Sequence, residues 1–256
     1  MIILRTRSEW DAVRTRAEAL CGRTASIGLI PTMGALHEGH LSLVHRSMAE
    51  NAVTIVSIFV NPTQFNNKAD LETYPSSFER DRALLEGAGV DYLFAPDYAE
   101  MYPDGYRYRL CETEESRALC GASRPGHFEG VLTIVLKLLS IFAPDRAYFG
   151  EKDYQQYSLI RGMAEAFFLR TEIVPCPLVR EKSGLAMSSR NRRLSPEGLA
   201  IAPLFHRVLA SGASVIETRR RLEAAGFAVD YIEDRSDRLF GAVFLEGVRL
   251  IDNVKR

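Results

Sequence analysis

Two histidines stand where the residue types and their spacing best fit chemistry. His37 and His40 lie in the stretch Pro-Thr-Met-Gly-Ala-Leu-His-Glu-Gly-His at residues 31–40. An apolar run at 26–30 leads into this stretch, and a segment with helical apolar spacing follows at 41–48, which predicts a strand, a turn and a helix. The start of a helix offers unpaired backbone N–H groups and the positive end of its dipole, so we expect a phosphate ligand here.

The spacing of the histidines fits that ligand. On the first turn of a helix, His37 and His40 share one face, where imidazoles can donate hydrogen bonds to a phosphate as its negative charge grows. Gly34 and Gly39 carry no Cβ, so the backbone can approach a ligand closely. Two other interpretations stay open. His-Glu-Gly-His is one residue shorter than the zinc motif His-Glu-x-x-His, which disfavours a metal pair, and either histidine could be a helix cap or a surface residue.

Three further polar clusters follow predicted strands or connections. Because the carboxyl ends of parallel strands open onto one crevice, we expect the first two to share a site with the histidines. The third lies in a later, basic stretch that could close over the site as a lid. The clusters are Asn61 with Gln64, Glu151-Lys152-Asp153, and Ser188-Ser189-Arg190.

Each cluster offers groups that suit a nucleotide and a small polar substrate. The Lys152 ammonium is a compact charge that suits a phosphate. Residues 188–190 supply two hydroxyls, successive N–H groups and a guanidinium, which suit a departing pyrophosphate. Gln64 and Gln156 carry neutral amides that can bind hydroxyls and a carboxylate. Taken singly, these would more often be a surface ion pair, a cap or solvated amides, so the hypothesis depends on their joint placement.

The composition limits the class of protein. The chain has 256 residues, 46% hydrophobic and 25% charged, with a net charge of −1, so no overall field attracts nucleic acid or an anionic membrane. The run at 219–221 is basic, but flanking Glu217 and Glu223 favour a solvated helix face. No apolar run reaches the roughly 18 residues of a membrane span, and residues 1–5 lack the pattern of a signal peptide. Four scattered cysteines predict neither a disulfide framework nor a zinc ribbon, so we expect a cytoplasmic protein.

Strand and helix patterns alternate up to residue 178. The run at 52–60 is apolar without alternation, as in a strand buried on both faces of a parallel sheet. The alternation predicts a Rossmann-like, doubly wound α/β fold with a parallel sheet. A weaker alternating pattern at 106–111 suggests an edge strand. The predicted strands are 26–30, 52–60, 90–95, 146–149 and 171–176, and the predicted helices are 9–20, 41–48, 78–86, 127–142 and 154–168.

The pattern changes near Pro177. Ser195-Pro196 is a typical helix start, and a helix is expected to run to about residue 210. The remaining pattern predicts a small α+β unit. We therefore expect two domains: residues 1–178, which bind the nucleotide and the substrate, and residues 179–256, which form a smaller lid. The unit's other predicted elements are a helix at 215–225 and strands at 227–233, 241–245 and 248–251.

Several common motifs are absent from the sequence. It holds no G-x-G-x-x-G, no G-x-x-x-x-G-K-[ST] and no nucleophile elbow, which disfavours NAD binding and Walker-type phosphoryl transfer. Instead, the chain resembles the pantoate–β-alanine ligases of the nucleotidylyltransferase superfamily over nearly its whole length. The stretches that carry the resemblance are PTMGALHEGHLSLV at 31–44, SIFVNPTQF at 57–65, RPGHFEGVLTIVLKLL at 124–139, AYFGEKDYQQ at 147–156, GLAMSSRN at 184–191 and LIDN at 250–253.

The resemblance implies roles for the site residues. Gln64 and Gln156 would bind pantoate, and Gln64 would also lie near β-alanine. Mg²⁺ would be held mainly by the ATP phosphates, with no metal site on the protein. The catalytic residues would be His37, His40, Lys152, Ser188, Ser189 and Arg190. The ATP site would consist of Met33, Gly34, Ala35, Leu36, His37, Glu38, Gly39, His40, Gly150, Glu151, Lys152, Asp153, Val179, Met187, Ser188, Ser189 and Arg190.

The resemblance also implies a reaction in two steps. Pantoate would attack ATP to form pantoyl adenylate and pyrophosphate, and β-alanine would then displace AMP, without a covalent enzyme intermediate. The partners would be these small molecules and a second copy of the chain in a homodimer, with no nucleic acid and no membrane. Three alternatives stay open: another nucleotidyltransferase, an inactive nucleotide-binding module and an RNA-binding synthetase-like module, the last disfavoured by the near-neutral charge.

Overall fold

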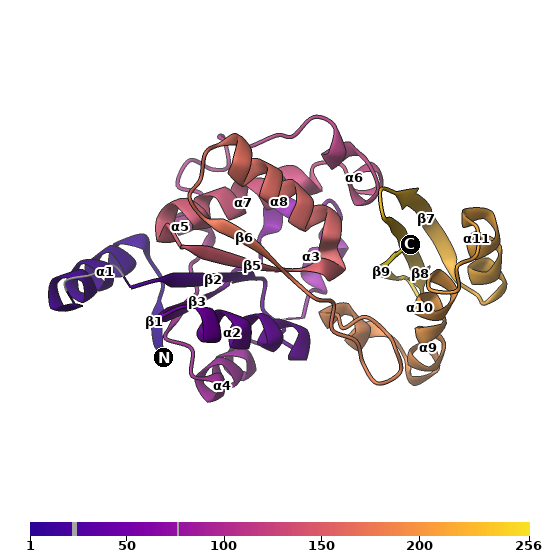
Figure 1. The fold of residues 1–256 in the computed structure, drawn as a ribbon, viewed down its shortest axis with the longest axis horizontal. Coiled ribbons are helices and arrows are strands. Elements are labelled where there is room, and N and C mark those ends of the chain that lie inside the picture. The colour runs from indigo at the N-terminus through magenta and orange to yellow at the C-terminus, as the bar shows by residue number, and fades with distance from the viewer. Residues whose placement is uncertain (22–24, 76) are drawn as a thin grey trace.

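Two sheets organise the molecule. The computed structural model describes residues 1–21, 25–75 and 77–256, with the backbone alone for 15–21. Within these residues, six strands form one sheet and three strands form another. Figure 1 shows the larger sheet with its helices on one side of the molecule and the smaller sheet, which ends at the C-terminus, on the other. We call these parts the large-sheet unit and the small-sheet unit.

The large sheet is entirely parallel, in the order β1-β4-β3-β2-β5-β6. After β2 the chain moves outward through β3 and β4, and it returns to the other side of β2 to form β5. The strand order therefore reverses between β2 and β5, which is where ligands bind in open α/β sheets. The predicted doubly wound fold is confirmed. The strands are β1 (Ile2–Leu4), β2 (Ile27–Thr32), β3 (Val53–Ile58), β4 (Tyr92–Phe94), β5 (Arg146–Gly150) and β6 (Glu172–Cys176).

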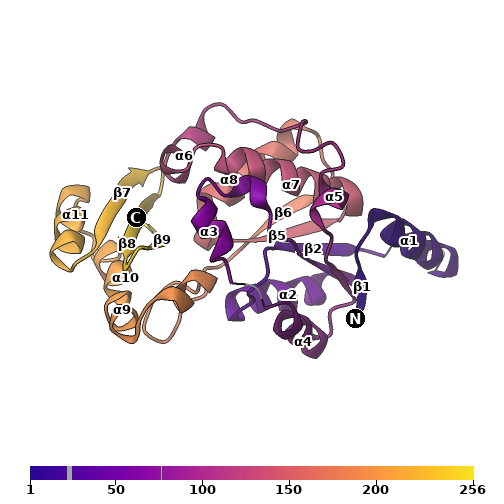
Figure 2. The same ribbon diagram turned by 180° about the vertical axis from the view of Figure 1, so that it is seen from behind.

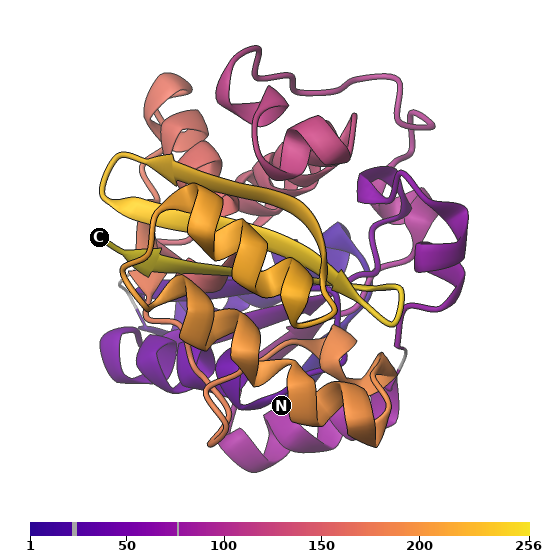
Figure 3. The same cartoon turned by 90° about the vertical axis from the view of Figure 1, so that its right-hand side faces the viewer.

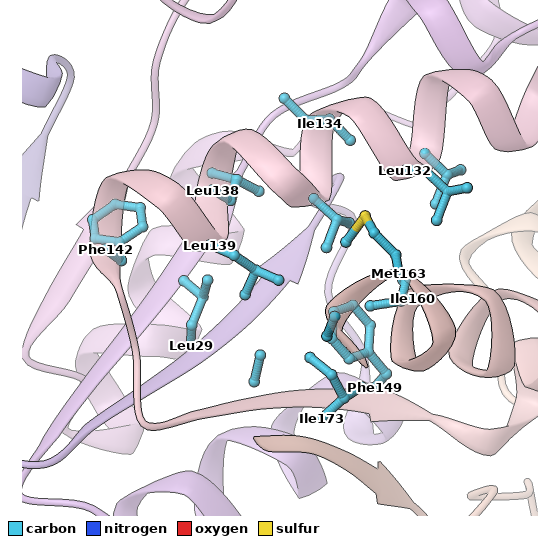
Figure 4. Packing of buried hydrophobic residues seen from close by; sticks show 14 of the residues in the cluster. Leu29, Leu132, Ile134, Leu138, Leu139, Phe142, Phe149, Ile160, Met163 and Ile173 are labelled. Atoms are coloured by element: carbon cyan, nitrogen blue, oxygen red, sulfur yellow. The ribbon is translucent and has the colours of Figure 1, made fainter. Parts of the chain in front are cut away.

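Helices cover both faces of this sheet (Figure 1). Successive strand residues point to opposite faces, so Leu29 packs with the helices of one face and Ile30 with those of the other. Figure 4 shows Phe149 and Ile173 of the sheet against Met163 of α8. Strands buried on both faces explain why the apolar runs lack alternation. One face carries α2 (Glu38–Glu50) and α4 (Phe78–Ala88), and the other carries α7 (His127–Phe142) and α8 (Tyr154–Ala166).

The remaining elements of the large-sheet unit are mostly short. The expected edge strand at 106–111 is wrong, because backbone N–H groups there bind side chains: that of Tyr108 donates to Asp104 and that of Leu110 to Thr133. Among the described helices, none combines the length and the apolar character needed to cross a membrane. The helices are α1 (Arg7–Cys21), η1 (Pro62–Gln64), α3 (Lys68–Glu72), α5 (Tyr98–Met101), η2 (Glu115–Arg117), α6 (Cys120–Ser123) and η3 (Glu151–Asp153).

The small-sheet unit has its own core. Its antiparallel sheet, β7-β8-β9, is covered on one face by helices (Figure 3), and Phe205 and Leu222 of these helices pack with Val243 of the sheet. The predicted helix from 196 to 210 is interrupted at Pro203, which lacks a backbone N–H. The elements are η4 (Ser189–Arg193), α9 (Pro196–Ile201), α10 (Pro203–Leu209), α11 (Val215–Ala224), β7 (Ala228–Arg235), β8 (Arg238–Leu245) and β9 (Val248–Lys255).

The buried side chains of the two units fall into different clusters, and only the partly buried Tyr231 and Ile251 of the small sheet pack against the core of the large-sheet unit within the described residues. This separation supports the division of the chain into residues 1–178 and 179–256, which stays a prediction.

A glycine of β2 lets α2 pack directly on the sheet, which gives a test of the fold. A Cβ at Gly28 would overlap Ser47 Oγ of α2 and lie 2.6 Å from Asn51 Nδ2. We expect Gly28→Ala to lower the free energy of unfolding by about 1–3 kcal/mol, because overpacking forces the helix away. Urea denaturation measures this change.

Gly162 provides the matched control. It lies within α8, and a Cβ there meets no heavy atom within 4 Å. Gly162→Ala should stabilise the protein by up to about 1 kcal/mol through helix propensity. Equal effects of the two substitutions would contradict the packing described for β2 and α2.

Candidate active site

A pocket opens where β2 and β5 end, at the reversal of strand order, and residues of both units line it. The structure thus brings together all four sequence-predicted clusters. Of the predicted site residues, those that line the pocket are Met33, His37, Gly39, His40, Gln64, Gly150, Lys152, Asp153, Gln156, Val179, Met187, Ser188, Ser189 and Arg190. The predicted residues that do not line it are Gly34, Ala35, Leu36, Glu38 and Glu151.

Backbone hydrogen bonds fix both histidine rings at the start of α2. His37 is the N-cap, and its Nδ1 accepts a hydrogen bond from the Gly39 N–H at 3.1 Å. The Nδ1 of His40 accepts from the His37 N–H at 3.3 Å, and the two ring centroids lie 4.1 Å apart. Because Nδ1 is an acceptor in each ring, the proton of the neutral imidazole must sit on Nε2. His37 is therefore both the helix cap and a pocket residue.

Both rings are neutral at physiological pH. Burial, together with the charges of Lys152 and Arg192, lowers the pKa of His37 to about 4. Burial also lowers the pKa of His40 to about 3, with contributions from His37 and Lys152. Neutral rings with a proton on Nε2 are hydrogen-bond donors that bring no charge to desolvate. Such donors can stabilise negative charge that develops on a phosphate.

A buried carboxylate holds the loop that leads to the histidines. Asp81 of α4 is 1% exposed, and it accepts hydrogen bonds from the N–H groups of Ala35 at 2.6 Å and Leu36 at 2.9 Å. Because these two amides bind Asp81, Ala35 and Leu36 fix the position of the loop and do not line the pocket. The sequence did not indicate this role for Asp81, because the pattern of its segment predicts only a helix.

Gly39 leaves room for the His37 ring. A Cβ at Gly39 would lie 2.9 Å from Nδ1 and Cε1 of His37. Gly39 therefore allows His37 to cap the helix and to line the pocket at the same time.

The small sheet fixes the turn that carries Lys152. The Nδ2 of Asn253 on β9 donates to the carbonyls of Glu151 at 2.9 Å and Lys152 at 3.2 Å. Glu151 forms an ion pair with Arg238 at 2.9 Å, so it joins the units instead of lining the pocket. The Nζ of Lys152 lies 3.3 Å from Asp153 Oδ2. These contacts give Asn253 of the LIDN stretch a structural role that the sequence alone did not reveal.

The segment 188–193 is docked against α3, which Figure 2 shows between the large sheet and the small-sheet unit. The Asp70 carboxylate accepts from Arg190 at 2.9 Å and from Arg193 at 2.8 Å. The Ser189 hydroxyl lies 3.4 Å from the Tyr74 hydroxyl. The contacts hold the expected lid segment over the pocket.

A buried polar network positions Gln64. The Nδ2 of Asn61 donates to Gln64 Oε1 at 3.0 Å, and Tyr102 donates to Asn61 Oδ1 at 2.9 Å. The Nε2 of Gln64 lies 3.2 Å from the sulfur of Met33, which is a weak acceptor. From the other side, the Gln64 carbonyl lies 2.9 Å from His127 Nδ1. Sequence reasoning missed His127, although it belongs to the RPGHF stretch that carries the resemblance.

Comparison with known proteins places the chain in a family. The sequence model of the family Pantoate-beta-alanine ligase matches residues 3–255. The chain belongs to the pantoate–β-alanine ligase family. It is 49% identical to the pantothenate synthetase of Bdellovibrio bacteriovorus, over 99% of this chain and 98% of that protein. It is 46% identical to that of Coxiella burnetii, strain Dugway, over 98% of this chain and 96% of that protein.

Solved structures agree. A pantoate–β-alanine ligase from Francisella tularensis, described as complexed with beta-gamma ATP and beta-alanine, has a TM-score of 0.93 and 42% identity, covering 100% of this chain and 97% of that one. The pantothenate synthetase of Thermus thermophilus has a TM-score of 0.89 and 41% identity, covering 100% and 99%. The chain is thus a ligase of pantoate and β-alanine, as its sequence predicted.

Substitutions of His37 separate its two roles in this ligase. His37→Ala removes the Nε2–H donor and the helix cap, so we expect kcat to fall about 100- to 1000-fold and stability to fall by about 1 kcal/mol. His37→Asn keeps a good cap but is too short to reach the same point. It should restore the free energy of unfolding but not turnover, measured by AMP release and urea denaturation. Recovery of turnover in His37→Asn would show that His37 acts only as a cap.

The pH dependence of stability tests the neutral state of His127. Burial, together with the neighbouring Arg124 charge, lowers the pKa of His127 to about 3. The folded state then binds fewer protons than the unfolded state below about pH 6.5, so the stability from neutral His127 is complete above that pH and is lost as pH falls toward 3.

His127→Asn removes this titration. The difference in unfolding free energy between wild type and His127→Asn should therefore shrink by up to about 2 kcal/mol between pH 7 and pH 5. Urea denaturation at both pH values measures it. A difference that stays constant would contradict a neutral, buried His127.

Proposed function

We propose that this ligase activates pantoate as an adenylate. A pantoate carboxylate oxygen attacks the α-phosphorus of ATP, the bond to the β-phosphate oxygen breaks, and pyrophosphate leaves. The amine of β-alanine then attacks the carbonyl carbon of pantoyl adenylate, loses a proton, and displaces AMP to give pantothenate. The observation that carries the proposal is the pair of neutral, Nε2-protonated histidines beside Lys152 at the reversal of strand order.

The residues of the pocket would act as donors and as charges. His37 and His40 donate from Nε2 to phosphate oxygens as charge moves onto them. Lys152 offers a compact charge to the same phosphates, and residues 188–190 add hydroxyls and a guanidinium. Arg190 then shares its fork between Asp70 and the departing pyrophosphate. No protein nucleophile is needed, because positioning and charge stabilisation supply the catalysis.

Pantoate would bind beside the two glutamines. Gln64 and Gln156 both line the pocket. Among the described residues, the Met33 sulfur is the one hydrogen-bond partner of Gln64 Nε2, so a hydroxyl or carboxylate oxygen of pantoate is a better partner for that N–H. The Oε1 is already held by Asn61, which fixes the direction of the amide. Gln64 also adjoins the place proposed for β-alanine.

We propose that Mg²⁺ enters with ATP. Among the described residues, no group of three or more His, Cys, Asp or Glu side chains lies close enough together to hold a metal ion. The single carboxylate among the described residues that line the pocket is Asp153, and it is paired with Lys152. This donor set fits an ion that keeps several water ligands and is otherwise bound mainly by phosphate oxygens. The ion would neutralise phosphate charge.

Assembly and location complete the proposal. A homodimer formed through the large-sheet unit is what the family resemblance implies. A cytoplasmic location rests on the free cysteines: Cys111, Cys120 and Cys176 form no disulfide within the described residues. The near-zero net charge supports small molecules, not nucleic acid or membrane, as partners.

An isotope experiment tests the adenylate. Pantoate labelled with ¹⁸O in its carboxylate should transfer one ¹⁸O atom to AMP, because the C–O bond to the attacking oxygen breaks in the second step. Mass spectrometry of the AMP measures this transfer, and pantoate should support ATP–pyrophosphate exchange without β-alanine. Label in inorganic phosphate together with ADP would instead reveal an acyl-phosphate route and contradict the proposal.

A further inference from the structure

Among the described residues, Arg124 has no acidic partner. It lies between α6 and α7, and its Nη1 is 3.1 Å from Nε2 of His127, while its Nη2 donates to the Gln64 carbonyl at 3.4 Å. Both partners are neutral. Within the part of the chain that the structure describes, no carboxylate forms an ion pair with Arg124, although it is only partly exposed. A guanidinium withdrawn from water without a counter-charge calls for an anionic ligand.

The surrounding charges strengthen this requirement. Burial, together with the charges of Arg190 and Arg249, lowers the pKa of Arg124 to about 10. Those two arginines have carboxylates of their own: Arg190 pairs with Asp70 at 2.9 Å, and Arg249 pairs with Asp230 at 2.8 Å. Arg124 is therefore the cation of this cluster that an incoming anion would neutralise.

Arg124 lines a second pocket that adjoins the first. Lys152, Asp153, Ser188 and Arg190 line both pockets, so the two are neighbours across these residues. Arg124 touches the backbone of Gln64, whose side chain lines the first pocket. A short ligand can then place one end at Arg124 and the other near Gln64.

The pantoate carboxylate must face the α-phosphorus of ATP in the proposed reaction. Two other anions could meet Arg124: pyrophosphate and the carboxylate of β-alanine. In the proposed function, Lys152 and residues 188–190 already face the phosphates. Arg124 instead donates a hydrogen bond to the backbone of Gln64, the residue proposed to lie near β-alanine. A guanidinium fork also matches a carboxylate in shape.

We propose that Arg124 binds the carboxylate of β-alanine and thereby selects an amine that carries an acid group at its far end. The inference rests on the proposed function and names a residue for its second substrate. His127 positions the guanidinium, because its Nε2 accepts an N–H from Arg124 while its Nδ1–H donates to Gln64. The β-alanine amine then points away from Arg124, toward the first pocket and the activated carbonyl.

Removing the charge should affect only the second substrate. For Arg124→Met, we expect kcat/KM for β-alanine to fall about 30-fold or more, the usual cost of leaving a bound charge without its partner. The neutral analogue β-alaninamide, used at saturating ATP and pantoate, should change by less than about threefold. Pantoate-dependent ATP–pyrophosphate exchange, which needs no amine, should likewise stay within about threefold. Arg124→Lys keeps the charge and should recover part of the lost kcat/KM.

A matched control removes another cation of the same pocket together with its partner. The double substitution Arg249→Met with Asp230→Asn should leave kcat/KM for β-alanine within about threefold, because that pair is neutral overall. A loss of exchange in Arg124→Met would assign Arg124 to the first step, with pantoate or pyrophosphate as its ligand, and overturn the proposal. Equal losses with β-alanine and β-alaninamide would show a purely structural role and overturn it too. Failure of the proposed function is distinguishable, since wild type would then show no pantoate-dependent exchange.

Discussion

Two backbone hydrogen bonds at the start of α2 determine what this site can do. They run from the Gly39 N–H to His37 and from the His37 N–H to His40, and they occupy Nδ1 of both rings. The protons are left on Nε2, and burial keeps both rings neutral. Asp81 anchors the loop before the helix by accepting hydrogen bonds from two of its amides. The start of a helix usually binds an anion through its backbone N–H groups. Here it presents the Nε2–H groups of two imidazoles to the anion.

The rest of the fold brings charge to these donors from both sides. Asn253 of the small sheet fixes the turn that carries Lys152. Asp70 of the large-sheet unit fixes Arg190, which follows the two serines of the lid segment. Each unit thus holds a functional segment of the other, so the site is complete only when the two are in contact. The contacts named here between the two units are polar, and polar interfaces are typical of parts of a chain that move relative to one another.

Local patterns were enough to predict the parallel sheet, the helix His127–Phe142 and the meeting of the polar clusters at strand ends. What they could not predict depends on partners far away in the chain. Asp81 binds amides 45 and 46 positions earlier, and periodicity within α4 carries no sign of it. The alternating pattern at 106–111 failed because side chains took the backbone N–H groups that a strand would need. Arg124 stands out only once the structure shows which of its neighbours already have carboxylates.

The tautomers of the histidines test the central claim most directly. Two-dimensional ¹H–¹⁵N NMR of the histidine rings, with resonances assigned through single substitutions, distinguishes a protonated nitrogen from an acceptor. At pH 7, His37 and His40 should show bare Nδ1 and protonated Nε2, whereas His127 should show the opposite tautomer, with its proton on Nδ1 toward Gln64. Imidazolium signals that titrate near pH 6.5, or a proton on Nδ1 of His37 and His40, would contradict the account of this site.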